Sequence, residues 1–496
     1  MFKSLIQKIR QVMYKMGLIK GLKSLSQLKD IDINEDMLQK IEVWKALYKG
    51  YYEGTSQEPF HKINIQTMAG KKTRRMLSMN MPKAISQEMA SLIFNEKCEI
   101  NIDNKAVEDF MEGIFQDNKF NKNFQDYLEF MFAMGGMVIK PYHDNGKIKL
   151  SYVTADCFFP ISWDNKGVYE AVFPNEFKRR GKWYTLLEWH LCEGNQYVIR
   201  NELFQSENKS ELGIKVPLST IYEDLEEEIY FKNIDRSLMA YFKPNIANNF
   251  DTHSPLGISL YANSLDTLRT IDTMFDSFNR EFRLGKKRII VPHYMIKSVI
   301  DPETGDTYRY FDANDETYEA FKFSHEKEDV KDINVELRVE EHINAINAML
   351  NYLAIQTGFS PGTFTFDGQS MKTATEVVSE NSKTFKSKQS HETIIEAGLQ
   401  ELVAVCVQLG MAFDLISDPG EYTVTVKFDD SIAEDKNAEI NKQIQMINAK
   451  MQSRKRAIMK VHGLTEKEAE ELLQEINEEN ATATAESLNF FGGRGD

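Results

Sequence analysis

Residues 340–372 read EEHINAINAMLNYLAIQTGFSPGTFTFDGQSMK, and this stretch decides how the rest of the chain is interpreted. Its first half predicts a helix that ends at Gly358, because apolar residues recur three and four positions apart. These apolar residues are Ile343, Ile346, Met349, Leu350 and Leu353. A glycine- and proline-rich loop then runs from Gly358 to Lys372.

A second, longer helix is expected after this loop, over 373–416. Thr373 stands three residues before Glu376, which is the capping-box pattern of a helix start. Two helices and one loop form a hairpin in many proteins. Here the loop is long, and its FTF and SMKT pieces have no evident core to enter, so we expect a functional loop or a disordered one.

The composition indicates a folded protein with several parts. The chain has 496 residues, 42% of them hydrophobic, and a net charge of −15. Such length predicts two to four domains or lobes, and such charge argues against a protein whose main work is to grip nucleic acid. The four cysteines are scattered, which disfavours a disulfide framework or zinc ribbon and suits a reducing cytosol. We expect no transmembrane span and no secretory signal.

The first half of the chain passes from helices to strands. Residues 1–20 form a basic amphipathic segment, which indicates either a helix that binds a membrane surface or nucleic acid, or one that docks on the body or a neighbouring subunit. Further helices are expected at about 35–49, 82–94 and 120–134. A hairpin around Asp144-Asn145-Gly146 then opens a β-rich lobe over 137–245, with strands at about 168–173, 182–192 and 196–201. We expect its aromatic residues to fill a sheet core: Tyr142, Tyr152, Phe158, Phe159, Trp163, Trp183, Tyr184 and Trp189.

Two long helices bracket a small insertion in the second half. A helix over about 258–284 ends at Gly285, and short strands with an Asp301-Pro302 turn follow over 286–335 before the 340–357 helix returns. Beyond the long helix we expect one strand in EYTVTVKFDD, then helices over about 434–460 and 465–476. The tail 479–496 has the composition of a disordered segment.

Signatures of catalysis are missing from the sequence. The Gly362–Gly368 spacing does not fit a phosphate-binding loop, and G-x-S-x-G and HExxH are absent. A metal-dependent nuclease remains an alternative, since Asp429, Asp430, Glu434 and Asp435 form a dense acidic set near a strand end. We therefore predict that the protein is not an enzyme and has no cofactor, catalytic residue or metal site.

The order of these parts resembles that of portal proteins of tailed bacteriophages, most closely the siphophage type of Gram-positive hosts. The resembling pieces are KIEVWKALYKGYYEG (40–54), ASLIFNEKCEI (90–100) and GFSPGTFTFDGQSMKTATEVVSENSKTFKSKQSHE (358–392). The resemblance implies a mainly helical α+β subunit of a ring with wing, stem, clip and crown, in which two stem helices bracket a small α/β clip. The parts it implies are 1–255 wing, 256–285 stem helix, 286–335 clip, 336–357 stem helix, 358–372 tunnel loop, 373–433 spanning helix and strand returning to the wing, and 434–478 crown.

The same resemblance implies the function and the partners. Twelve subunits would form a ring at one capsid vertex, assembled in the host bacterial cytoplasm, and double-stranded DNA would pass through it during packaging and ejection. The expected partners are further copies of the chain, the terminase large subunit, the head–tail adaptor, and the major capsid and scaffolding proteins. Another phage head structural or head-completion protein is the main alternative.

Three groups of residues are candidate sites on this interpretation. The DNA-facing loop would use Gly358, Ser360, Gly362, Phe364, Phe366, Gly368, Gln369, Met371 and Lys372. Two basic clusters would flank it, Lys286, Lys287 and Arg288 near the clip, and Arg454, Lys455 and Arg456 in the crown. The alternative interpretation of both clusters is solvated surface or pairing to acids between subunits.

Overall fold

The structure is a computed structural model of the whole chain. It describes residues 35–55, 58–67, 70–95, 98–193, 196–209, 212–232, 234, 236–285, 288–290, 297–300, 302, 304–305, 307–310, 331–333, 336–366, 382–428, 436–462, 469–470 and 472–476. The expectations for the 1–20 helix, the Thr373–Glu376 capping box, the acidic set at 429–435 and the 479–496 tail lie outside these residues.

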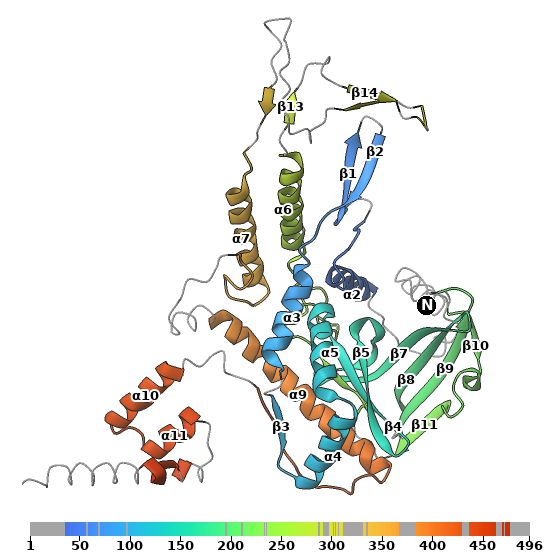
Figure 1. Cartoon of the computed structure of the whole chain (residues 1–496). Coiled ribbons are helices and arrows are strands. Elements are labelled where there is room, and N and C mark those ends of the chain that lie inside the picture. Colours follow the sequence, from blue (N-terminus) through green and yellow to red (C-terminus); the bar gives the residue numbers. More distant parts are fainter. Residues whose placement is uncertain are drawn as a thin grey trace, which may run out of the picture.

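A bundle of helices forms the centre of the body. Its members are α2 (Glu35–Tyr48), α3 (Met81–Ile93), α4 (Lys105–Asp117), α5 (Phe120–Met134) and α9 (Ser382–Ala412). α5 buries Phe124, Leu128 and Phe132, and α9 buries Leu399 and Leu402, all in one continuous hydrophobic core. Figure 1 shows α3, α5 and α9 crossing one another in this body. The three N-terminal helices predicted from sequence are confirmed to within one residue at each end.

Antiparallel sheets complete the body. One sheet has the order β10 (Ile214–Val216), β9 (Gln196–Ser206), β8 (Lys182–Glu193), β7 (Val168–Arg179), β6 (Phe159–Trp163), with β11 (Glu228–Lys232) also on β9. A second sheet joins β12 (Ala240–Phe242), β4 (Met137–Asp144) and β5 (Lys147–Thr154), and a third pairs β3 (Glu99–Ile102) with β17 (Val424–Lys427). Short 3₁₀ turns, η2 (Ala155–Cys157) and η3 (Leu218–Thr220), connect strands.

The predicted hairpin and its aromatic core are largely confirmed. Asn145 and Gly146 both have positive φ, as a tight turn between β4 and β5 requires. Phe158, Phe159, Tyr184 and Trp189 are buried, and Tyr152, Trp163 and Trp183 are half-buried. Tyr142 was wrongly placed in the core, because it lies near the solvent end of β4 and is 49% exposed.

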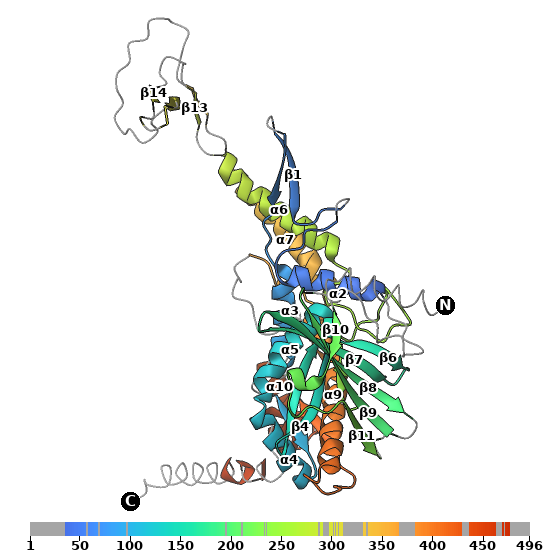
Figure 2. The ribbon, with the colours of Figure 1, turned by 90° about the vertical axis from the view of Figure 1, so that its right-hand side faces the viewer.

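Two antiparallel helices project from the body. They are α6 (Leu265–Leu284) and α7 (Val339–Gln356), which pack side by side (Figure 1). Beyond them lie two strand pairs, β13 (Arg288–Ile290) with β16 (Lys331–Ile333), and β14 (Lys297–Ile300) with β15 (Thr307–Tyr310). A further hairpin, β1 (Lys62–Thr67) with β2 (Gly70–Arg75), stands beside α6 (Figure 2).

Two helix predictions need correction. The helix expected from 258 begins at Leu265, because the backbone N–H of Leu260 bonds the carbonyl of Phe132 at the end of α5 and holds the preceding residues out of a helix. The helix expected over 373–416 ends at Ala412, where Asp414 adopts a left-handed conformation (φ 53°). The described residues of 286–335 form strands and turns, and the prediction of an α/β insertion there stays a prediction.

The helix expected over 434–460 is two helices, α10 (Lys436–Asn448) and α11 (Arg454–His462). Lys450 has φ 56°, and its N–H donates to the carbonyl of Ile447. The N–H of Met451 donates to the carbonyl of Met446. These are the two hydrogen bonds of a Schellman motif, which ends α10. Ser453 then caps α11 by accepting from the N–H of Arg456.

One helix has the length and hydropathy of a membrane span. It is Lys383–Ala412 of α9, and 56% of its most apolar window is buried inside the protein. Its contacts with α3, α4, β4, β12 and β17 make it the central core helix of the body, a role that selects the same composition.

Candidate functional site

The segment that joins α7 to α9 begins with a tight helix ending. Gly358 has φ +86°, and the N–H of Phe359 reaches back to the carbonyl of Ala354. A Cβ added at Gly358 would lie 2.4 Å from the Oγ of Ser387 on α9. Glycine at this position therefore serves both the backbone turn and the close approach of α9.

Hydrogen bonds hold the following residues onto both helices. The backbone N–H of Ser360 donates to the Oγ1 of Thr384 at 2.8 Å, and the N–H of Thr384 donates to the Oγ of Ser360 at 3.2 Å. On the α7 side, Asn351 accepts from the N–H of Gly362 at 2.6 Å. Asn347 accepts from the N–H of Phe366 at 3.1 Å. The start of the predicted loop is thus an ordered bridge between α7 and α9.

The aromatic residues of the loop divide into buried and exposed positions. Phe359 is fully buried, and Phe364 packs edge-on against it with ring centroids 5.0 Å apart. The FTF piece therefore does enter the core through Phe364, contrary to expectation. Phe366 is 57% exposed, and Pro361 to Thr363 are exposed as well.

The structure contradicts one candidate of the DNA-facing loop. Ser360 is 0% exposed, because its backbone and hydroxyl are both bonded to Thr384, so it does not reach solvent. Gly362, Phe364 and Phe366 keep an accessible or partly accessible position. Gly368, Gln369, Met371 and Lys372 lie outside the described residues.

A charged and aromatic contact joins α6 to the start of α7. The guanidinium of Arg338 donates to both oxygens of Glu281, at 3.1 and 2.9 Å. This hydrogen bonding holds the pKa of the Glu281 carboxyl below its ordinary value. The ring of Phe278 lies 5.4 Å from that of His342, and Gly285 approaches Leu337 closely. The chain therefore leaves α6 and enters α7 at adjacent points.

The two predicted basic clusters are not equally visible. Lys286 and Lys287 lie outside the described residues, and Arg288 begins β13. Arg454 and Arg456 are exposed in the first turn of α11. Lys455 pairs with Glu470 of the same chain at 2.8 Å.

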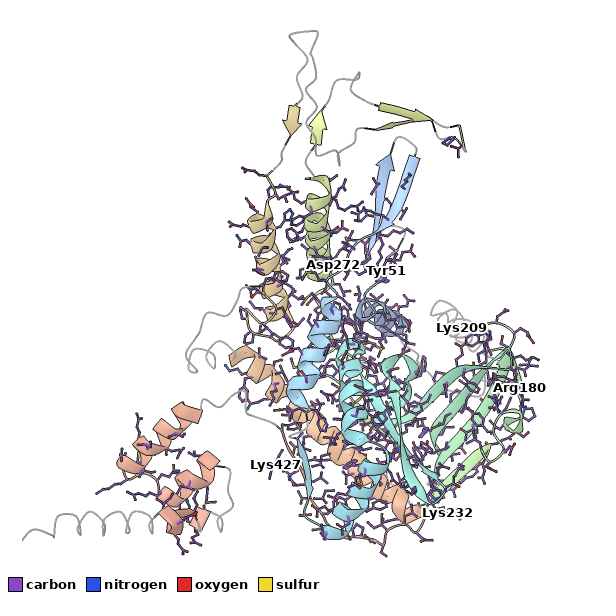
Figure 3. The ribbon with its side chains drawn as sticks, in the orientation of Figure 1. Tyr51, Arg180, Lys209, Lys232, Asp272 and Lys427 are labelled. Carbon is purple, nitrogen blue, oxygen red and sulfur yellow. The ribbon has the colours of Figure 1, made fainter. Side chains whose placement is uncertain are left out.

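Sequence reasoning missed the β1–β2 hairpin and its attachment to α6. Asp276 of α6 accepts from both guanidinium nitrogens of Arg74, at 2.7 and 2.5 Å, and this bonding lowers the pKa of Asp276. Asp272 accepts from His61, from the Oγ of Ser78 and from the N–H of Met79. Figure 3 labels Asp272 beside Tyr51 at the foot of the hairpin. The signal in the sequence was the pair of acids one turn apart on a helix otherwise rich in apolar residues.

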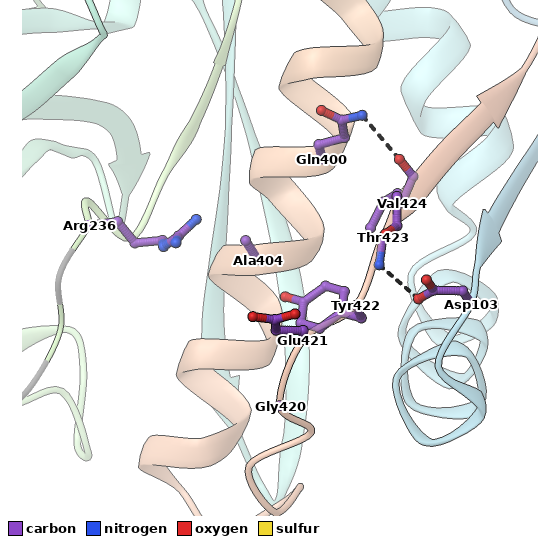
Figure 4. Close-up of a pocket in the computed structure, with 9 residues that line it drawn as sticks. All are labelled: Asp103, Arg236, Gln400, Ala404, Gly420, Glu421, Tyr422, Thr423 and Val424. Atoms are coloured by element: carbon purple, nitrogen blue, oxygen red, sulfur yellow. Dashed lines mark hydrogen bonds between the residues drawn. The ribbon is translucent and has the colours of Figure 1, made fainter.

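An open cleft of about 810 Å³ lies between α9 and the β3–β17 pair. Its lining is Asp103, Arg236, Gln400, Ala404, Gly420, Glu421, Tyr422, Thr423 and Val424 (Figure 4). The polar groups are engaged in structure: Gln400 donates to the carbonyl of Val424 at 3.0 Å, Asp103 accepts from the N–H of Thr423 at 2.7 Å, and Arg236 pairs with Glu401 at 3.3 Å. Within the described residues, no group of three or more His, Cys, Asp or Glu is placed to hold a metal ion.

These features define a protein with a mixed helix-and-sheet body and a projecting helix pair. The family model for phage portal proteins of the SPP1 Gp6-like type matches residues 27–482, and the chain therefore belongs to this family. Portal proteins of this family are structural, non-enzymatic proteins of the phage particle.

Two further comparisons complete this result. A solved structure similar to this chain is the virion of a native gene transfer agent (GTA) particle, with 11% identity, a TM-score of 0.42, and coverage of 77% of this chain and 88% of that one. No curated protein matches the chain.

Proposed function

We propose that this portal protein is the subunit of a twelve-membered ring at one capsid vertex, and that double-stranded DNA passes through the ring during packaging and ejection. Membership of the portal family over residues 27–482 carries the proposal. The projecting α6–α7 pair, which ends in small strand pairs, supports it as the stem of such a subunit.

The charge of the chain suits a channel for DNA. A wall that bound phosphates tightly would repeat each contact twelve times and would oppose sliding. A net charge of −15, with basic residues gathered only locally, disfavours such binding. Closed rings need two different complementary surfaces on each subunit, and the elongated helices offer such flanks.

The parts of the chain are assigned as the family resemblance implies. Residues 1–255 form the wing, α6 and α7 the stem, 286–335 the clip, and 434–478 the crown. The clip binds the terminase large subunit during packaging and the head–tail adaptor afterwards, while the outer parts contact capsid and scaffolding proteins. A siphophage of a Gram-positive host is the source that the sequence favours, with assembly in the host cytoplasm.

The tunnel loop is assigned to 361–372, shortened at its start because Ser360 is buried. Phe366 is its exposed aromatic residue among those described, and Gly362, with φ +90°, sets its turn. An aromatic side chain can slide along DNA without a fixed ionic bond, which suits a moving contact.

The deciding experiment is the mass of the purified protein in solution, with negative-stain images of the same fraction. Twelve copies of 57.3 kDa give a ring of roughly 690 kDa with a central hole, as a closed heterologous assembly requires. A stable dimer or tetramer at high concentration, without rings, would overturn the proposal.

A further inference from the structure

The β1–β2 hairpin is a strongly basic element in an acidic protein. Residues 62–75 read KINIQTMAGKKTRR and contain five basic residues and no acid. The strands β1 and β2 stand away from the body, and β1 runs toward the same end of the molecule as the C-terminus of α6 (Figures 1 and 2). A run of like charge along one projecting hairpin calls for an acidic partner.

Several of these basic side chains already form ion pairs or hydrogen bonds within the subunit. Arg74 binds Asp276, Lys62 pairs with Glu53, and Arg75 donates to the carbonyl of Gly50. These bonds fix the hairpin to α6 and to the body. Lys72 is exposed and forms no ion pair within the part of the chain that the structure describes, so its charge is available to a partner.

The start of α7 carries the opposite charge. Glu336, Glu340 and Glu341 are exposed; Glu341 interacts electrostatically with Arg338, whereas Glu336 and Glu340 form no ion pair among the described residues. Apolar side chains are exposed at the same corner, with Leu337 37% and Leu284 51% accessible. Exposed apolar groups rimmed by unpaired acids are typical of a surface that a partner covers.

The basic and acidic surfaces lie on opposite flanks of α6. Asp276 faces the hairpin and Glu281 faces α7, and five residues of α-helix turn the side chain by about 140°. Figure 1 shows α7, α6 and the hairpin in that order across the molecule. Contacts of one flank with the opposite flank of an identical molecule are heterologous and can close a ring.

The two surfaces also lie at the same height along α6. Lys72 is two strand residues beyond Arg74, or about 7 Å. Glu281, which binds the start of α7, is five helical residues beyond Asp276, or about 7.5 Å. A neighbour displaced sideways around a ring would thus bring its hairpin to the level of the acidic residues.

We propose that the β1–β2 hairpin of one subunit docks on the acidic start of α7 in the next subunit, Lys72 facing Glu336 and Glu340. The inference rests on the proposed ring and names the partner surface within it. It assigns the hairpin to a contact between copies of this chain rather than to DNA.

Charge reversal tests this contact. Variant A carries Lys72→Glu, at an exposed position that forms no ion pair among the described residues. Variant B carries Glu336→Lys with Glu340→Lys. In each variant the two facing surfaces have the same sign, so we expect the fraction of protein in rings to fall about tenfold or more at a concentration where the wild type is assembled.

A mixture of the two variants is the sharper measurement. The hairpin of A, with its charge reversed at position 72, faces the basic start of α7 in B, and the hairpin of B, which keeps Lys72, faces the acidic start of α7 in A. We expect equimolar A and B to form rings with alternating subunits, at a fraction within about twofold of wild type, as restored charge complementarity requires. Native mass spectrometry reads the composition, and circular dichroism confirms that each variant is folded.

The control variant Lys166→Glu makes the same charge change in the exposed turn between β6 and β7. It should assemble as the wild type does. The docking inference is overturned if A alone forms normal rings, or if the A and B mixture stays unassembled. Normal rings of A that no longer retain duplex DNA would assign the hairpin to nucleic acid instead. Failure of the wild type to form rings is the separate failure of the proposed function.

Discussion

His61 and Asp272 stand 211 residues apart in the chain, and their side chains meet at 2.8 Å between Nε2 and Oδ2 where the β1–β2 hairpin joins α6. The Nδ1 of His61 accepts from the backbone N–H of Tyr52 at 2.9 Å. Its single proton therefore sits on Nε2 and is donated to Asp272. Both residues are buried, so this joint fixes the hairpin on α6 through a defined tautomer.

Replacing Asp272 by Asn should destabilise this joint. An amide has one acceptor oxygen to serve His61, Ser78 and Met79, and its NH₂ group would face at least one donor. We expect a loss of about 1–3 kcal/mol of unfolding free energy, measured by urea unfolding at fixed protein concentration. Asp126→Asn, on the exposed face of α5, should stay within about 0.5 kcal/mol. Equal effects at both positions would show that the joint is not a source of stability.

Comparing Gly358→Ala with Gly362→Ala separates the stability lost through backbone strain from the stability lost through steric contact. Both glycines have φ near +90°, so alanine should cost about 1–2 kcal/mol at either site. Only Gly358 has a neighbour in the way, the Oγ of Ser387, whereas nothing lies within 4 Å of a Cβ at Gly362. Gly358→Ala should therefore lower the thermal midpoint more, and adding Ser387→Ala should recover part of that difference. Equal midpoints for the two single variants would contradict this account.

Phe359→Ala should lower the stability of the protein, whereas Phe366→Ala should leave stability unchanged and impair DNA packaging. Phe359 is fully buried, and its truncation should cost about 3–5 kcal/mol of stability. Phe366 is mostly exposed, so its truncation should change stability by less than about 0.5 kcal/mol. If Phe366 belongs to the tunnel loop, its variant should assemble normally yet yield fewer DNA-filled capsids in an infection assay. If the Phe366→Ala variant gives as many DNA-filled capsids as the wild type, the side chain of Phe366 has no role in DNA passage.

His391 should make the protein less stable in mild acid. It lies buried on α9, where its Nδ1 accepts from the N–H of Asn245 at 3.0 Å, and burial lowers its pKa to about 4. The unfolded chain binds the proton near pH 6.5, so stability is lost as the pH falls from about 6.5 to 4, on the order of 3 kcal/mol in all. His190, whose pKa burial also lowers, adds to the same slope.

His391→Gln should flatten the dependence of the urea midpoint on pH between 7 and 4.5, leaving the part due to His190. His253→Gln, at an exposed loop position, should retain the wild-type slope. A His391→Gln protein with the full wild-type slope would show that this imidazole is not the titrating group.

Local patterns predicted the elements that carry their own signals. The α2, α3 and α5 helices have apolar residues at helical spacing, and the β4–β5 hairpin has Asn-Gly at its turn. α4 had a signal that was overlooked: Asn104 caps its first turn, and Val107, Met111 and Ile114 form one buried face. The break between α10 and α11 depends on Lys450 in a left-handed conformation. It could not be predicted, because glycine or asparagine usually occupies such a position.

Elements held by distant partners could not be predicted. The β1–β2 hairpin has few apolar residues, and its attachment depends on Arg74 meeting Asp276, 202 residues away. The late start of α6 follows from the bond of Leu260 to Phe132. Of the candidate loop, Gly358 and Gly362 have positive φ and lie at turns. The burial of Ser360 requires Thr384, on a helix whose packing angle the sequence does not contain.

The close approach of Gly285 to Leu337 means that the chain departs from the helix pair and comes back at nearly the same point. The segment between them, residues 286–336, is therefore joined to the helix pair at two adjacent points. Its length can change at small entropic cost, since loop closure depends only weakly on length. The sequence and length of this segment can thus change in evolution to fit a new docking partner while the packing of α6 against α7 is retained. A transplant of 286–336 between related portals is the natural unit for exchanging that specificity.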